Sequence, residues 1–114
     1  MHRQKVPFTP MVPGQVSIYV CGPTPYAPAH IGHAYSAIAF DLIRRALTWM
    51  GYRVKYVRNV TDVDDSILPK ARELGVPYLE LAEAELARFR SDMDALDTRP
   101  PLAEPRAKIG RAHV

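Results

Sequence analysis

The residues best suited to chemistry lie in one short segment, residues 21–33 (CGPTPYAPAHIGH), which holds the single cysteine and two of the four histidines. His30 and His33 flank Ile31 and Gly32, and both imidazoles can donate hydrogen bonds to phosphoryl oxygens that gain negative charge. Gly32 has no side chain, so a flat base or a phosphate can approach the backbone closely. The segment suits the binding of ATP during attack on its α-phosphate. The pattern alone fits an incidental helix cap beside a surface histidine equally well.

The elements on either side of this segment favour the functional interpretation. Residues 16–21 (VSIYVC) have the length and composition of a buried strand, and the prolines of residues 22–28 make the next stretch a stiff loop. Residues 52–60 (YRVKYVRNV) alternate and predict a second strand. A helix between them is predicted from about residue 31 to Gly51 by apolar residues at spacings of three and four. Its apolar stripe comprises Ile31, Tyr35, Ile38, Ala39, Leu42, Ala46 and Trp49.

Strand, loop, helix and strand form a βαβ unit, which predicts an α/β fold with parallel strands and a right-handed crossover. The loop with both histidines then lies at the carboxyl end of a strand, where open α/β sheets bind ligands. The N–H groups at the start of the helix favour an anion there. Thr24 and Thr61 follow the two predicted strands, so we expect both to face the same pocket.

The second half of the chain reads as two further helices and a linker. The first is predicted from about Asp65 to Leu74, with Pro69 shortening or kinking it and Gly75 ending it. The second begins at Pro77 and is stopped by residues 99–101, with residues 102–114 as a linker. The packing face of the second helix comprises Leu79, Ala82, Leu86, Phe89, Met93 and Leu96.

One residue and two sets of residues admit more than one interpretation. A lone cysteine at the end of an apolar strand is more often a buried core residue than a ligand. Asp62, Asp64 and Asp65 could hold Mg²⁺, but capping and loop structure are favoured for them. A basic set could face a polyanion, although arginines on a helix and a strand more often form a solvated face. This set comprises Arg44, Arg45, Arg53, Lys55 and Arg58.

Several motifs together resemble one known family. Residues 30–33 (HIGH) are similar to the signature of class I aminoacyl-tRNA synthetases. Four further motifs resemble the cysteinyl-tRNA synthetases in particular. They are residues 19–24 (YVCGPT), residues 39–41 (AFD) with residues 51–52 (GY), residues 56–65 (YVRNVTDVDD), and residues 104–107 (EPRA). The resemblance runs from about Arg3 to Ala107, nearly the whole chain.

The resemblance implies a partial Rossmann-like (HUP-type) parallel-sheet nucleotide-binding domain, truncated, in residues 1–107. It implies an ATP-dependent ligase that uses ATP with Mg²⁺ to convert L-cysteine to cysteinyl-adenylate, then charges tRNA(Cys). His30 and His33 would be catalytic, and residues 30–33 (His30, Ile31, Gly32, His33) would bind ATP. Thr24 and Thr61 would hold the amino acid.

The same resemblance gives Cys21 a role as one of four ligands of a Zn²⁺ ion that binds the substrate thiolate. Zinc prefers sulfur, so a thiolate–zinc bond would reject serine without an editing site.

The family's other zinc ligands, its Lys-Met-Ser-Lys-Ser loop and its anticodon-binding helices have no match in this sequence. We therefore expect an N-terminal fragment that is inactive alone. After Ala107 the family pattern is lost, and residues 108–114 match one reading frame of a common sequencing adapter, so we expect a non-native tail there.

Three alternatives stay open. The first is a ligase that joins cysteine to glucosaminyl-inositol in mycothiol synthesis, which would keep Cys21 and both histidines. The second is a nucleotidyltransferase with the same two-histidine motif, which would need neither Cys21 nor residues 62–65 (DVDD). The third is an incomplete half-domain without activity. Open sheet edges and uncovered apolar faces would then make the chain marginally stable or prone to aggregation.

The composition limits the remaining possibilities. The chain has 114 residues, enough for one small domain, and a net charge of +3 that permits a polyanionic partner such as ATP or RNA. One cysteine excludes an internal disulfide. The sequence has no apolar run of about 20 residues and no apolar leader. We expect a cytoplasmic monomer without a membrane partner.

Overall fold

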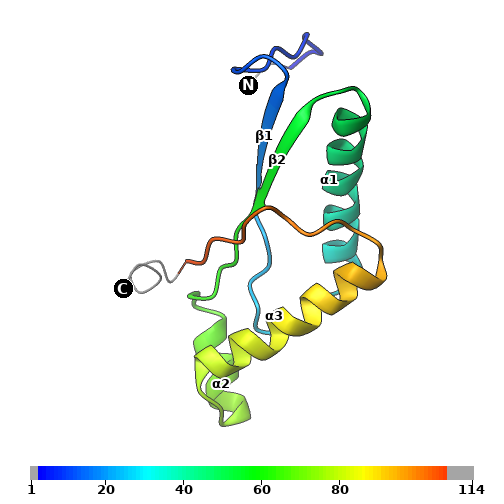
Figure 1. The fold of residues 1–114 in the computed structure, drawn as a ribbon. Helices are drawn as coiled ribbons and strands as arrows, with labels where there is room; N and C mark the ends of the chain where they lie inside the picture. Colours follow the sequence, from blue (N-terminus) through cyan, green and yellow to red (C-terminus); the bar gives the residue numbers. More distant parts are fainter. Residues whose placement is uncertain (1–2, 108–114) are drawn as a thin grey trace.

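Two parallel strands and three helices make up the fold in the computed structural model, which describes residues 3–107 (Figure 1). The elements follow the order β1 (Gln15–Val20), α1 (Ile31–Trp49), β2 (Arg53–Arg58), α2 (Ile67–Leu74) and α3 (Tyr78–Ala95). The strands pair in parallel from Gln15 opposite Arg53 to Val20 opposite Arg58. The predicted βαβ unit with a parallel sheet is therefore confirmed.

The segment after α3 was predicted as a linker, and for residues 102–107 that prediction is wrong. This segment runs along the free edge of β2, where Ala103 bridges Val57 and Arg106 bridges Val60, both in parallel. The backbone N–H of Leu102 donates to the Tyr56 carbonyl at 2.8 Å. The helix α3 already ends at Ala95, before the predicted stop at residues 99–101, and the backbone beyond the prolines pairs with the free edge of β2. The rest of the predicted linker and tail, residues 108–114, lies outside the described residues.

The helix boundaries follow local signals in the sequence. Gly51 follows the C-cap Met50 of α1 with a φ of 97°, and Gly75 is the C-cap of α2 with a φ of 68°. The helix α2 begins at Ile67, two residues later than predicted, so Pro69 lies in its first turn, where a missing N–H is tolerated. Within residues 3–107, no helix is both long and apolar enough to cross a membrane.

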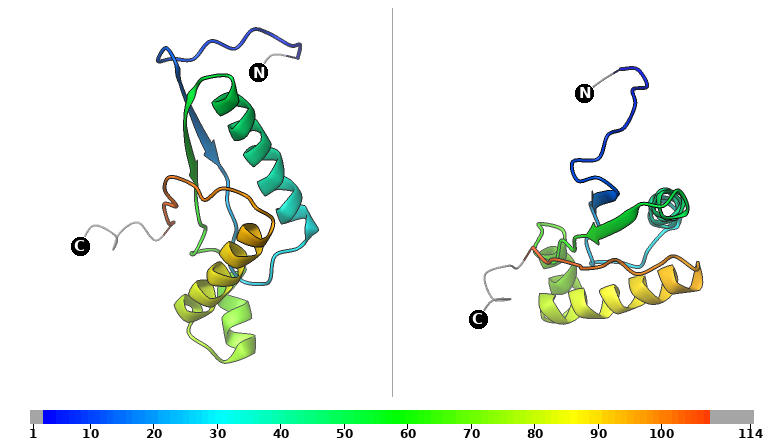
Figure 2. Two further views of the ribbon diagram at one scale, coloured as in Figure 1. Left: turned by 45° about the vertical axis from the view of Figure 1, so that its right-hand side comes forward. Right: turned by 45° about the horizontal axis from the view of Figure 1, so that its top comes forward.

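The helix α3 lies beyond the carboxyl ends of the strands and crosses the direction of α1 (Figures 1 and 2). Phe89 and Met93 of α3 pack on Ala37 of α1 in one buried cluster. A second cluster joins Leu81 of α3 to α2. Most of the predicted packing face of α3 is therefore buried. These two clusters hold α3 across the strand ends, so that α3 forms one wall around the loops that carry the candidate site.

Candidate active site

Hydrogen bonds join the two loops that leave the carboxyl ends of the strands. The backbone N–H of Gly22 donates to Oδ1 of Asn59 at 2.7 Å, and the N–H of Thr61 donates to the Pro23 carbonyl at 3.0 Å. A Cβ atom at Gly22 would lie 1.8 Å from the carbonyl oxygen of Asn59, so only glycine fits there. The backbone after β1 is thus held against the backbone after β2, and this contact fixes the path that leads to Cys21.

The two histidines cap the helix α1 with their own side chains. The backbone N–H of Gly32 donates to Nδ1 of His30 at 3.0 Å, and the N–H of His30 donates to Nδ1 of His33 at 3.1 Å. This is a reciprocal capping box in which imidazoles replace the usual hydroxyl and carboxylate. A Cβ atom on Gly32 would come within 2.8 Å of Cε1 of His30, so glycine also makes room for the ring.

The capping box determines which ring nitrogen carries the proton. Because Nδ1 of each imidazole accepts a backbone hydrogen bond, the proton of each neutral ring lies on Nε2. Burial and the neighbouring His30 lower the pKa of His33 below its ordinary value of 6.5. Its ring is therefore neutral near pH 7 and presents one Nε2–H donor. The two ring centroids lie 3.9 Å apart, so both donors leave the same end of α1.

The cap and the chemistry are therefore compatible. The sequence left open an incidental cap as the alternative to a functional pair, and the structure shows that both histidines do cap α1. Capping uses Nδ1 and leaves Nε2 available for a ligand. Nε2–H donors beside the positive end of a helix can stabilise negative charge that develops on a phosphoryl group.

Cys21 and His33 lie on the wall of one small cavity of about 50 Å³. Cys21 is exposed and not disulfide-bonded, so its interpretation as a buried core residue is wrong. His30 opens instead onto a shallow cavity of about 380 Å³ beside α3, which Asp92 and Leu96 also line. Thr24 and Thr61 were expected to face a common pocket, but neither side chain lines either of these cavities.

The acidic residues after β2 shape the loop. Asp64 accepts the backbone N–H of Ser66 at 3.0 Å, and this hydrogen bond lowers the pKa of its carboxyl group. Asp62 is buried and lies 3.6 Å from Arg106. In residues 3–107, no group of three or more histidine, cysteine, aspartate or glutamate side chains could hold a metal ion. Within residues 3–107, Cys21 alone cannot complete a zinc site.

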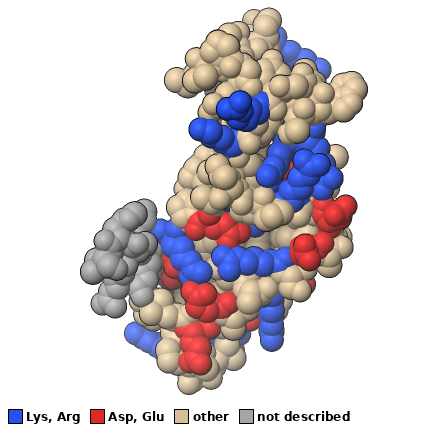
Figure 3. All heavy atoms as spheres, in the orientation of Figure 1, with Lys and Arg blue, Asp and Glu red and all other residues tan. Residues whose placement is uncertain are grey.

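The basic set contains residues that hold the fold together. The Arg44 guanidinium donates to the carbonyls of Arg99 and Pro100, at 3.2 and 2.8 Å, and so ties α1 to the segment after α3. Arg58, for which a solvated face was favoured, is only 7% exposed. Figure 3 shows basic and acidic side chains alternating over the α3 half of the molecule, as ion pairs require.

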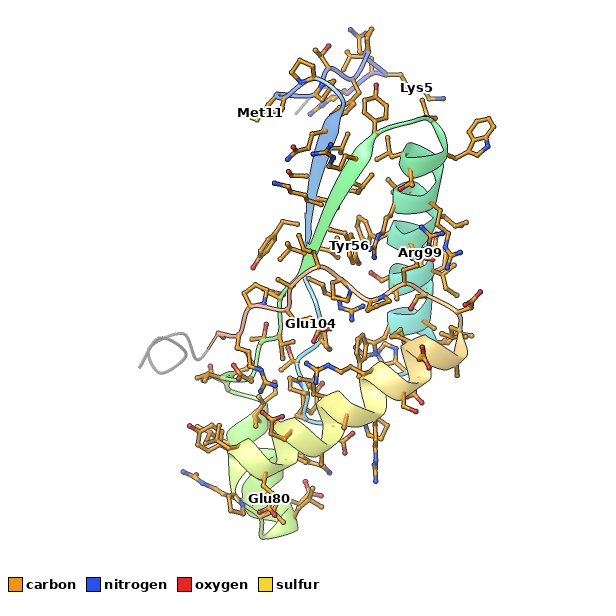
Figure 4. The ribbon with its side chains drawn as sticks, viewed as in Figure 1. Lys5, Met11, Tyr56, Glu80, Arg99 and Glu104 are labelled. Atoms are coloured by element: carbon orange, nitrogen blue, oxygen red, sulfur yellow. The ribbon has the colours of Figure 1, made fainter. Side chains whose placement is uncertain are left out.

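Arg58 and Glu104 form an ion pair that the sequence did not reveal. Nη2 of Arg58 lies 2.9 Å from Oε1 of Glu104, and both side chains are largely buried. Glu104 sits between the end of β2 and α3 (Figure 4). The two residues also line a cavity of about 590 Å³ between α3 and residues 98–104. The motif at residues 104–107 was the available signal, but a local motif does not show its long-range partner.

Comparison with known proteins identifies the family. A family model described as the class I (C) tRNA synthetase catalytic domain matches residues 7–111. The chain belongs to this family. The match confirms the resemblance drawn from the motifs. It also runs past residue 107, so the boundary predicted there stays a prediction.

Curated relatives and solved structures agree with this assignment. Cysteine–tRNA ligases of Wolinella succinogenes and Helicobacter pylori are 49% and 50% identical over 105 residues, which is 92% of this chain. That of Levilactobacillus brevis is 50% identical over 107 residues, 94% of the chain. The chain spans only 22–23% of the length of these relatives.

A structure of Mycobacterium tuberculosis methionyl-tRNA synthetase bound by methionyl-adenylate superposes with a TM-score of 0.73 at 27% identity, covering 82% of this chain and 19% of that one. A second structure of that synthetase with methionyl-adenylate gives a TM-score of 0.67 at 30% identity, over 72% and 16% of the two chains. The predicted Rossmann-like α/β class is confirmed.

Proposed function

We propose that this chain carries the adenylate-forming end of a cysteine–tRNA ligase. The observation that carries the proposal is the imidazole capping box at the start of α1, which uses Nδ1 of both rings and leaves both Nε2 atoms out of the cap. About half of the residues are identical to those of proteins named cysteine–tRNA ligase, which supports cysteine as the amino acid. Residues 30–33 would then contact ATP, and His30 and His33 would be the catalytic donors.

In the proposed reaction, a carboxylate oxygen of cysteine attacks the α-phosphorus of ATP. The bond from that phosphorus to the oxygen bridging the α- and β-phosphates breaks, which yields cysteinyl-adenylate and pyrophosphate. Negative charge grows on the phosphoryl oxygens as the leaving oxygen departs. Donors fixed in advance at Nε2 of His30 and His33 stabilise that charge without reorganising. A terminal hydroxyl of tRNA(Cys) then attacks the cysteinyl carbonyl and releases AMP.

The remaining assignments are parts of the same proposal. Cys21 is a candidate zinc ligand whose further donors would come from outside residues 3–107, so no step is derived through the metal. Thr24 and Thr61 are candidate contacts to the amino acid, supported by the backbone hydrogen bond that joins their loops. Mg²⁺ would enter with ATP. A cytoplasmic, monomeric enzyme stays a prediction.

The proposal is tested by cysteine-dependent exchange of pyrophosphate into ATP in a complete ligase, meaning a cysteine–tRNA ligase that carries this segment. His33→Gln should lower the exchange rate by about 100-fold, since one donor to the transition state is lost. Glutamine at this position can still accept the His30 N–H, so the helix cap is kept and the effect isolates the chemistry. Full exchange by His33→Gln contradicts the role of the imidazole.

Two further measurements complete the test. Cys21→Ser should raise the KM for cysteine and leave the KM for ATP unchanged, because the thiol lies on the cysteine side of the proposed site. Transfer of cysteine to tRNA(Cys), and not to an aminosugar, separates the proposed ligase from the mycothiol-type ligase. Exchange that does not depend on cysteine overturns the assignment of the amino acid.

A further inference from the structure

A stack of side chains connects the segment after α3 to the signature histidine. The Arg58 guanidinium carbon lies 4.9 Å from the centre of the Phe89 ring. The Phe89 ring stands at 88° to the His33 ring, with centroids 6.5 Å apart. Glu104 binds the other side of Arg58 at 2.9 Å. These are favourable cation–π and edge-to-face contacts, so Glu104, Arg58, Phe89 and His33 form one continuous row.

The far end of the row is firmly anchored. Oε2 of Glu104 accepts hydrogen bonds from Nε and Nη2 of Arg90, at 3.0 and 2.7 Å. Burial raises the pKa of Glu104, but hydrogen bonds from Arg90 and Arg58 outweigh it and lower the pKa overall. The carboxylate therefore stays charged at neutral pH. The backbone N–H of Arg58 also donates to the Ala103 carbonyl, so the segment that carries Glu104 is paired with β2.

Stability alone does not account for a charge at this place. A buried ion pair is about as stabilising as apolar side chains of similar volume, because desolvation offsets the attraction. Nε of Arg58 is also buried without a hydrogen-bond partner. Arg58 nevertheless forms part of the wall of the cavity that holds Cys21 and His33. The Arg58 guanidinium is therefore kept beside a candidate site despite the cost of its desolvation, which points to a role in that site.

The row supplies a constraint that the helix cap lacks. One hydrogen bond at Nδ1 holds the position of the His33 ring but does not by itself fix the tilt of the ring about that bond. The perpendicular Phe89 ring limits the tilt, and Arg58 holds Phe89 in turn. We propose that Phe89, backed by Arg58 and Glu104, is a positioning residue that aims Nε2 of His33 at the reacting phosphate. This inference rests on the proposed function.

The test compares two substitutions of Phe89 in the complete ligase by pyrophosphate exchange. Phe89→Leu keeps an apolar side chain but removes the ring edge, and it should lower kcat by about 10-fold with little change in the KM for cysteine. Phe89→Tyr keeps the ring and should retain a rate within about threefold. Glu104→Gln should lower kcat in the same direction, whereas Glu73→Gln, in an exposed ion pair with Lys70, should leave it unchanged.

A double substitution decides whether Phe89 acts through His33. In a His33→Gln background the ring to be aimed is gone, so adding Phe89→Leu should cause no further loss. The same fold loss in both backgrounds, or equal losses in Phe89→Leu and Phe89→Tyr, would overturn the inference. A full rate in His33→Gln alone would overturn the proposed role of His33 and the positioning with it. Loss in His33→Gln without loss in Phe89→Leu would overturn only the positioning.

Discussion

The helices α1 and α3 have nearly the same length, 19 and 18 residues, but they are used in opposite ways. α1 carries the candidate chemistry in its first turn and buries only Ala37 and Asp41. α3 contributes no side chain to the proposed chemical step, yet it is the main source of core residues. Its buried residues are Leu81, Ala82, Glu85, Leu86, Phe89 and Met93.

The difference shows that an apolar stripe and a buried face are separate properties. A stripe at helical spacing normally faces a core. On α1, however, Leu42 is 62% exposed and Trp49 is 88% exposed, because the face that packs against the rest of the chain is the one that holds Ala37 and Asp41. The periodicity correctly predicts a helix in both cases. Which face is covered depends on what else packs there, and that information lies elsewhere in the chain.

The largest expected effect compares one leucine from each helix. Leu86 of α3 is 1% exposed, so Leu86→Ala should lower the free energy of unfolding by about 2–5 kcal/mol through lost burial and a cavity. Leu42→Ala on α1 makes the same chemical change on an exposed surface and should stay within about 0.5 kcal/mol. Urea denaturation followed by circular dichroism measures both.

Similar losses in the two leucine variants would show that the stripe on α1 is covered in solution. Equal losses would also contradict the contrast between the helices. The marginal stability expected from exposed apolar faces stays a prediction, and a sharp cooperative melt of the chain would count against it.

Most of the fold could be predicted because its signals are local. The two strands are short β-branched runs, and glycines with positive φ follow α1 and α2 where the sequence indicates. The pairing of residues 102–107 with β2 could not be predicted, because proline-rich sequence reads as a linker whatever edge lies beside it. The same limit hid the ion pair of Arg58 and Glu104, whose residues are 46 positions apart.

The sequence predicted which residues belong to the candidate site but not how their side chains are oriented. Spacing placed His30, His33 and Cys21 at the carboxyl end of a strand, and the structure puts Cys21 and His33 on one cavity. It could not show that both imidazoles cap α1 through Nδ1, since capping depends on ring orientation. Phe89 gave no functional signal, because it is one residue in an ordinary packing stripe.

A smaller effect is expected from the cap that distinguishes α1. His33→Ala removes the acceptor of the His30 N–H and should destabilise the chain by about 1 kcal/mol. His33→Gln restores an acceptor at the same helix position and should recover most of that loss. His30→Ala and His30→Asn form a second matched pair, because asparagine is a good N-cap. Urea midpoints that do not separate alanine from the amide variants would argue against an imidazole cap.

The smallest effect is a dependence of stability on pH that only α1 should show near neutrality. The pKa of His33 is lowered in the folded state, so the unfolded chain takes up the proton first as the pH falls through the ordinary value of 6.5. Stability should therefore be highest above that value and decline below it. Protonation of Nδ1 would also remove the acceptor that caps the helix. Carboxylates such as Glu104, with a lowered pKa, lose their contribution only below about 4.5.

The part of the pH dependence that comes from His33 can be isolated by comparing melting temperatures at about pH 7.5 and about pH 5.5. His33→Gln keeps the cap but cannot take up a proton, so its Tm should fall less than that of the unaltered chain. A substitution of an exposed, uncharged residue of α3, such as Ala87→Gln, should leave the fall unchanged. If Tm falls by the same amount in His33→Gln and in the unaltered chain, protonation of His33 does not affect the stability of the fold. The helix cap must then be equally stable with the imidazole neutral or protonated.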